Sequence, residues 1–219
     1  MSDKMNTKHL FFHVLIFLSA AAGAAEWEIG AFRCSDWPFS IRQGEEFSMR
    51  GKFIVVLPPW RFFSSETLRE FARSDEGVSG VLAAGAYRFP YRQKLVRSNG
   101  NAIDFSLQLD TPEGTPLQKE LNPCWCLSIQ MDQAKAAGLF VGGKPVVLPP
   151  GNRWSWTNQL SFPKVGLVMK TGTPCSINLI GSDTLQIRII ARETERAEGG
   201  KRWKIDGSLL LGQQEKKAE

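Results

Sequence analysis

Apolar and polar residues alternate with a period of two along much of this chain, which restricts those segments to β-strands. In IDFSLQLD the apolar positions are Ile103, Phe105, Leu107 and Leu109, and polar residues stand between them. The segments WSWTNQLSF (154–162) and TLQIRIIAR (184–192) alternate in the same way. Such alternation is typical of strands with one face buried and the other in water.

Glycine-containing turns separate these segments. Asn99-Gly100 is a strong signal for a two-residue hairpin loop, and the pairs Gly142-Gly143 and Gly199-Gly200 suit tight hairpins as well. Many short strands with hairpin turns predict a mainly β fold, an antiparallel, jelly-roll-like β-sandwich, rather than alternating βαβ units.

Helix is predicted only in one or two short segments. SSETLREFARSDEG (64–77) has Ser65 in position to cap a helix, with Leu68, Phe71 and Ala72 on one face. DQAKAAG (132–138) predicts a second helix, capped by Asp132 and stopped by Gly138.

The first 25 residues have the layout of a secretory signal peptide. Lys4 and Lys8 precede an apolar run from Leu10 to Leu18, and small residues follow as far as Ala25. We therefore expect residues 1–25 to be removed, residues 26–212 to form one β-sandwich domain and residues 213–219 to form a disordered tail. The expected location is secreted or periplasmic, without stable membrane insertion.

Both histidines of the chain, His9 and His13, lie inside the expected signal peptide. A mature chain without histidine excludes the Ser-His-Asp and Cys-His forms of nucleophilic catalysis and zinc sites that use imidazole. We expect neither a cofactor nor a metal. The formal net charge of +5 is mild and permits an acidic polysaccharide as partner, whereas the absence of a dense basic block disfavours nucleic acid. The oligomeric state stays open.

Two groups of residues are candidates for binding carbohydrate. Trp37 and Trp60 stand beside prolines, where an exposed indole face would cover the apolar face of a sugar ring. The segment GAYRFPYRQKLVR (85–97) interleaves aromatic and basic residues, which would combine stacking with bidentate pairing to an acidic sugar. Its candidates are Tyr87, Arg88, Tyr91 and Arg92. The alternative for this segment is an ordinary strand whose arginines face water. Trp125, Trp154 and Trp156 share apolar stripes with their neighbours and are predicted to pack in the core.

Carboxylates at alternate positions, as in a glycoside hydrolase, occur twice. The pairs are Glu26 with Glu28 and Glu193 with Glu195, and both are predicted to be solvated surface.

The mature chain holds four cysteines, Cys34, Cys124, Cys126 and Cys175. An even number in an exported chain favours disulfides. On the strand CWCLSIQM, Cys124 and Cys126 lie on the face opposite Trp125, and a bond between them would strain a small ring. We therefore expect each to pair with either Cys34 or Cys175. The alternatives are a four-thiolate zinc site and a redox motif, and neither matches the C-x-C spacing.

Two segments in the second half of the chain carry a resemblance. LSIQMDQAKAAGLFVGGKPVVLPP (127–150) and SFPKVGLVMKTGTPCSINLIGSDTLQIRII (161–190) resemble the amino-terminal β-sandwich domains of large secreted bacterial glycoside hydrolases. The resemblance implies a sandwich that accompanies carbohydrate-active enzymes, and it transfers no catalytic residue. Such domains usually precede a catalytic barrel, whereas we expect the end of this sequence to coincide with the close of the sandwich.

These observations favour a secreted, non-catalytic β-sandwich module that binds or accompanies polysaccharide. Two alternatives stay open. One is a histidine-free polysaccharide lyase or glycoside hydrolase. The other is a structural or protein-interaction module of the cell envelope.

Overall fold

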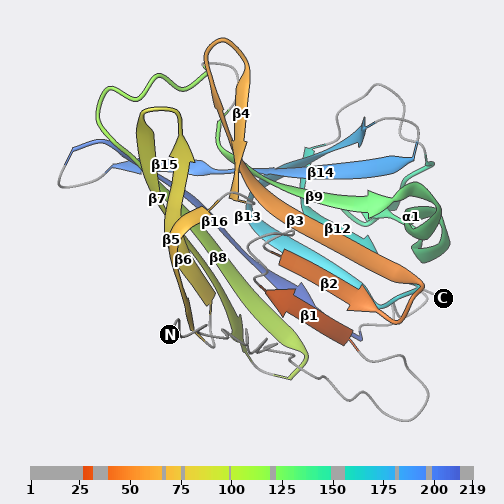
Figure 1. Ribbon diagram of the computed structural model, residues 1–219. Helices are drawn as coiled ribbons and strands as arrows, with labels where there is room; N and C mark the ends of the chain where they lie inside the picture. Colours follow the sequence, from red (N-terminus) through yellow and green to blue (C-terminus); the bar gives the residue numbers. More distant parts are fainter. Residues whose placement is uncertain are drawn as a thin grey trace, which may run out of the picture.

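The computed structural model describes residues 27–31, 39–65, 68–74, 77–98, 100–118, 122–148, 156–180, 183–195 and 199–212. Within these residues sixteen antiparallel strands form a curled sheet that folds onto itself as a sandwich, and the chain also contains one α-helix (Figure 1). The predicted mainly β sandwich fold is thereby confirmed. The expected signal peptide (1–25) and tail (213–219) lie outside the described residues.

Two groups of strands form the layers (Figure 1). The first layer contains, in spatial order, β1 (Trp27–Ala31), β2 (Phe39–Gln43), β3 (Phe47–Leu57), β9 (Cys124–Gln130) and β14 (Thr184–Ile190). The second contains β16 (Lys201–Leu210), β8 (Ala102–Thr111), β7 (Tyr87–Arg97), β6 (Gly77–Ala84) and β5 (Leu68–Ser74). Outside this path lie β4 (Arg61–Ser64), β10 (Phe140–Val141), β11 (Lys144–Pro145), β12 (Trp156–Phe162) and β15 (Arg192–Glu195).

One long strand, β13 (Leu167–Ile180), joins the two layers. Its first part pairs with β16 through Val168 to Thr171, and its second part pairs with β14 from Cys175 onward. Gly172 lies between the two pairings, beside a register shift in the ladder to β12. A single strand that changes partner in this way turns the sheet around the core instead of leaving it flat.

The core lies between the layers and is rich in aromatic side chains. Trp125 of β9 contacts Phe39 at a centroid distance of 4.8 Å and Phe105 of the opposite layer at 5.0 Å. The stripes predicted from alternation, including the four residues from Ile103 to Leu109, are buried. Trp154 lies outside the described residues. Buried residues from Trp27 to Leu211 belong to one hydrophobic cluster.

The glycine turns form the predicted hairpins. Gly100 joins β7 to β8, Gly142-Gly143 joins β10 to β11, and Gly199-Gly200 joins β15 to β16. The backbone of Gly200 has φ +78°, and a Cβ there would lie 2.3 Å from the carbonyl oxygen of Thr111, so no other residue fits without displacing β8.

The helix predicted near residue 132 is confirmed as α1 (Met131–Ala137). Its N-cap is Gln130, two residues before the expected cap, so Asp132 lies in the first turn, and the helix ends at Ala137 with Gly138 as its C-cap. No helix among the described residues is long and apolar enough to cross a bilayer.

The helix predicted over 64–77 is wrong, because residues 68–74 form β5 and pair with β6. Ser65 does not cap a helix but accepts a hydrogen bond from the Phe53 N–H at 2.8 Å. A register shift between Arg69 and Ala72, with Glu70 at φ +49°, accommodates extra residues in the strand. Ladder pairing to β6 therefore overrides the local helical pattern.

Candidate functional site

The aromatic and basic residues of β7 lie on opposite faces of the sheet. Tyr91 is 1% exposed and contacts Phe53 of the opposite layer at a centroid distance of 5.7 Å. Arg88 and Arg92 point outward into water. The expectation that Tyr91 stacks on a sugar beside these arginines is therefore wrong, because side chains two apart on a strand share a face and neighbours do not.

Three of the four residues predicted on β7, namely Tyr91, Tyr87 and Arg88, contact other side chains. Burial raises the pKa of Tyr91 well above its usual value, and its hydroxyl donates to the side chain of Gln93 in the core. Tyr87 is half-buried and stacks on Phe89. The Arg88 guanidinium forms an exposed ion pair with Glu70 at 2.9 Å. Of this set Arg92 alone is both exposed and outside any ion pair within the described residues.

The prediction that Trp60 is exposed is confirmed. Trp60 lies in the turn of the β3–β4 hairpin, with 53% of its surface exposed, and Phe62 at the start of β4 is 62% exposed. The hairpin extends beyond the body of the sandwich, at the top of Figure 1. The backbone of Trp60 has φ +63°, a conformation that L-residues other than glycine adopt rarely. Trp37 lies outside the described residues.

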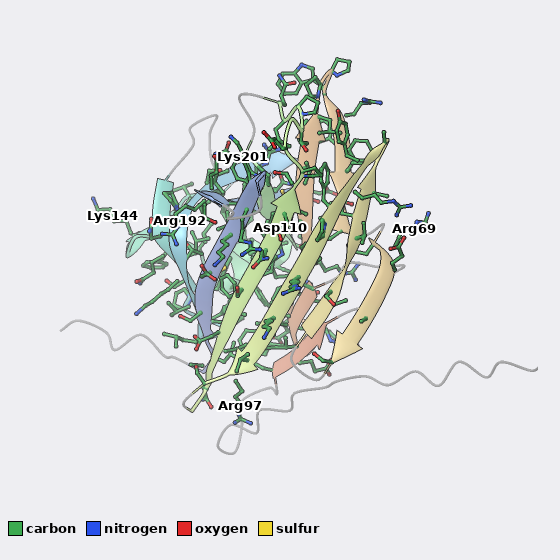
Figure 2. The ribbon with its side chains drawn as sticks, turned by 90° about the vertical axis from the view of Figure 1, so that its left-hand side faces the viewer. Arg69, Arg97, Asp110, Lys144, Arg192 and Lys201 are labelled. Carbon is green, nitrogen blue, oxygen red and sulfur yellow. The ribbon has the colours of Figure 1, made fainter. Side chains whose placement is uncertain are left out.

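A row of basic side chains crosses the outer face of the second layer, which Figure 2 views from outside. Strand register places Arg92 of β7 opposite Gln108 of β8, Gln108 opposite Lys204 of β16, and Lys204 opposite Arg192 of β15. Arg92, Lys204 and Arg192 form no ion pair with another described residue. We call Arg92, Lys204 and Arg192, together with Gln108 between the first two, the basic row. Strands spaced about 4.8 Å apart put Arg92 and Lys204 roughly 10 Å from each other at the backbone.

Acidic residues on the same face lie in the adjoining rows. The Asp110 carboxylate, near the middle of Figure 2, accepts from Arg202 Nε at 2.8 Å and from Arg202 Nη2 at 3.0 Å. Gln108 also donates to this carboxylate, at 3.3 Å. Asp206 lies two positions from Lys204, opposite Ser106. Because Arg202 pairs with Asp110, the basic row keeps a positive potential of its own.

Replacing Asp110 with asparagine tests this bidentate pair. The Asp110 side chain is 10% exposed, so the change leaves a half-buried guanidinium without its charged acceptor. We expect the free energy of unfolding to fall by about 2 kcal/mol, measured by urea denaturation. Asp104→Asn, at an exposed position on the same strand and face, is the control and should change stability by less than about 0.5 kcal/mol. An equal effect at both positions would contradict a special role for the pair.

Glu28 and Glu193, two of the carboxylates at alternate strand positions, lie at the solvated surface as predicted. Each also forms an ion pair with a basic side chain. Glu28 accepts from Arg42 at 2.7 Å, and Glu193 accepts from Lys201 at 3.0 Å. Glu26 lies outside the described residues. Neither described carboxylate is placed as a buried acid or base for sugar hydrolysis.

The expected disulfides to Cys175 are wrong. Cys175 is a buried free thiol on the core face of β13, and its Sγ donates to the carbonyl oxygen of Thr157 at 3.0 Å. Cys124 and Cys126 lie on the outer face of β9, so the sheet separates them from Cys175. Both are free thiols with their Sγ atoms 3.5 Å apart, beyond bonding distance. Cys34 lies outside the described residues.

The sequence pattern does not single out Gln108, Lys204 or Arg192 as binding residues. Alternation already puts Gln108 and Lys204 on wet faces, but nothing in a single strand shows which strands are neighbours. The row arises because β8 and β16, nearly 100 residues apart, pair along their whole length.

Comparison with known proteins gives no relative from which to transfer a function. No protein-family model matches this chain, and no match to a curated protein is found.

Proposed function

We propose that this protein is an exported, non-catalytic β-sandwich module that binds an acidic polysaccharide on the outer face of β7, β8, β16 and β15. The single observation that carries the proposal is the basic row, which crosses four neighbouring strands. Its three cations have no ion-pair partner among the described residues. The expected signal peptide supports export.

The chemistry of the row suits carboxylate or sulfate groups along an extended polymer. Arg92 and Arg192 carry guanidinium groups, which pair with such anions through two parallel hydrogen bonds. Gln108 stands between two of the cations and offers a neutral amide to sugar hydroxyls. Because the described aromatic side chains of β7 face the core, recognition on this surface rests on charge and hydrogen bonds rather than on stacking.

Binding to polysaccharides of matched length but different charge tests the proposal. The protein should bind polymers of uronic acids or sulfated sugars, fail to bind neutral glucans, and lose affinity as salt is added. Replacing Arg92, Lys204 and Arg192 together with glutamine should weaken binding roughly tenfold to a hundredfold, since each exposed charge contributes up to about 1 kcal/mol. Isothermal titration calorimetry measures the change.

A charge-matched control separates the row from net charge alone. Arg50→Gln, Lys135→Gln and Lys164→Gln remove three exposed charges from β3, α1 and the turn after β12. This variant should bind almost as tightly as the unmodified protein. Equal loss in both triple variants, or no binding to any acidic polymer, would reject the proposal.

The exposed hairpin favours a second candidate, a protein-interaction module of the cell envelope. Trp60 and Phe62 present apolar surface at the end of β3 and the start of β4, and large aromatic side chains are frequent anchors in protein interfaces. The double variant Trp60→Ala with Phe62→Ser separates the candidates. If this variant no longer cross-links to an envelope protein but still binds polysaccharide, the protein-interaction module is favoured. If it loses polysaccharide binding, the sugar site lies at the hairpin instead.

A further inference from the structure

Cys124 and Cys126 form a pair of thiols on the outer face of β9. Their Sγ atoms are 3.5 Å apart, and the residues are 8% and 1% exposed. The pair lies apart from the basic row, on the other layer of the sandwich. Two sulfur atoms held side by side and shielded from water are candidate ligands for a thiophilic ion.

The neighbouring strands surround this pair unequally. Cys126 lies opposite Lys52 of β3 on one side and opposite Arg188 of β14 on the other. Cys124 lies between Ile54 and Ile190 in the same two strands. Residues directly opposite on a sheet have Cβ atoms about 5 Å apart. One end of the pair is therefore flanked by two cations and the other by aliphatic side chains.

We propose that Cys124 and Cys126 bind a single Cu(I) ion as a two-coordinate bis-thiolate site. Soft thiolates select Cu(I), which is stable with two ligands. Zinc requires four ligands, and no group of three or more His, Cys, Asp or Glu side chains suitable for a metal occurs among the described residues. A Cu(I) ion with two thiolates carries one net negative charge, which Lys52 and Arg188 stabilise.

The site requires a small local movement. With metal–sulfur bonds of about 2.3 Å, as in zinc–thiolate sites, a linear arrangement places the sulfurs roughly 4.6 Å apart. The present separation is 3.5 Å. Cα atoms two residues apart on a strand are separated by roughly 6.8 Å, so rotation about the Cα–Cβ bonds provides the extra distance. Binding forms two copper–sulfur bonds, and each of the two cysteine thiols that is still protonated releases its proton to solvent.

Titration of the reduced, full-length protein with Cu(I) under anaerobic conditions, in competition with a Cu(I) chelator, tests the proposal. We expect one Cu(I) per chain, an ultraviolet thiolate-to-copper absorption band, and two sulfur ligands by X-ray absorption at the copper edge. Cys124→Ser and Cys126→Ser should each remove the site. Lys52→Met should weaken it about tenfold, as expected for a group that acts through a ligand.

A matched thiol control and measurements on the unmodified protein complete the experiment. Cys175→Ser should keep one Cu(I) per chain, since Cys175 lies on the opposite face of the sheet. Retained binding in the double variant of Cys124 and Cys126 would overturn the proposal. Fewer than two sulfur ligands in the unmodified protein would also overturn it, even if the serine variants fail to fold. The proposal would also be overturned if mass spectrometry of protein purified from the producing cells finds Cys124 or Cys126 in a disulfide.

Discussion

Replacing Trp125 with alanine is expected to lower the free energy of unfolding by about 3–5 kcal/mol. Trp125 has no exposed surface and packs against Phe39 in its own layer and Phe105 in the other. Truncation removes an aromatic contact that joins the two layers and leaves a cavity that the surrounding strands cannot fill without breaking their ladders. Urea denaturation followed by far-ultraviolet circular dichroism measures the loss.

Two further substitutions define the origin of this effect. The indole N–H of Trp125 has no hydrogen-bond partner. Trp125→Phe therefore keeps an aromatic ring and removes an unsatisfied donor. We expect this substitution to lower the free energy of unfolding by less than about 1.5 kcal/mol. Phe62→Ala at the exposed hairpin should change stability by less than about 0.5 kcal/mol. A small effect of Trp125→Ala, similar to that of Phe62→Ala, would contradict the packing of the two layers described above.

Alkaline pH is expected to destabilise the fold, in part through Cys175. Burial raises the pKa of the Cys175 thiol to about 12 from an ordinary value of about 9. The raised pKa means that the folded state favours the protonated thiol. This contribution is therefore complete below pH 9 and is lost as the pH rises toward 12. Between pH 9 and 11 the loss amounts to roughly 2–3 kcal/mol, at 1.36 kcal/mol for each pH unit.

Cys175→Ser isolates this contribution. The serine hydroxyl can still donate to the carbonyl oxygen of Thr157, as the thiol does, but it does not ionise in this range. The variant should therefore lose less stability between pH 9 and 11 than the unmodified protein, with reductant present in both. Tyr91 and Cys126, whose pKa values are also raised, contribute a decline common to both proteins. Parallel pH profiles would show that Cys175 ionises equally in the folded and unfolded states.

Local pattern was sufficient for most strands of this fold but not for all. The alternation in residues 103–109 predicted the buried stripe of β8 correctly, because a period of two puts every second side chain on the core side wherever the strand pairs. Residues 68–74 have a helical spacing of apolar residues, yet they form β5. The pairing partner β6 supplies ladder hydrogen bonds that a short isolated helix lacks, and this partner is a property of the assembled sheet.

The candidate sites were predicted only in part, for the same reason. Arg92 was identified from its own strand, and the shared face of Cys124 and Cys126 followed from their spacing. The interpretation of Tyr91 as a surface residue failed because a mixed aromatic and basic segment was treated as a single surface, whereas a strand divides it between core and solvent. Lys204 and Arg192 joined Arg92 only through the pairing of β16 with β8 and β15.

The amino-acid sequence by itself determined most of the strands, the glycine hairpins and the inward stripes, because these depend on residues adjacent along the chain. Tertiary structure alone decided which strands are neighbours, which outward side chains form rows and which residues of β3 and β14 flank the cysteine pair. The basic row and the cation-flanked cysteine pair both arise between strands distant in sequence. Their register is set by burial of the core stripes on the opposite face, which holds the outer residues opposite one another.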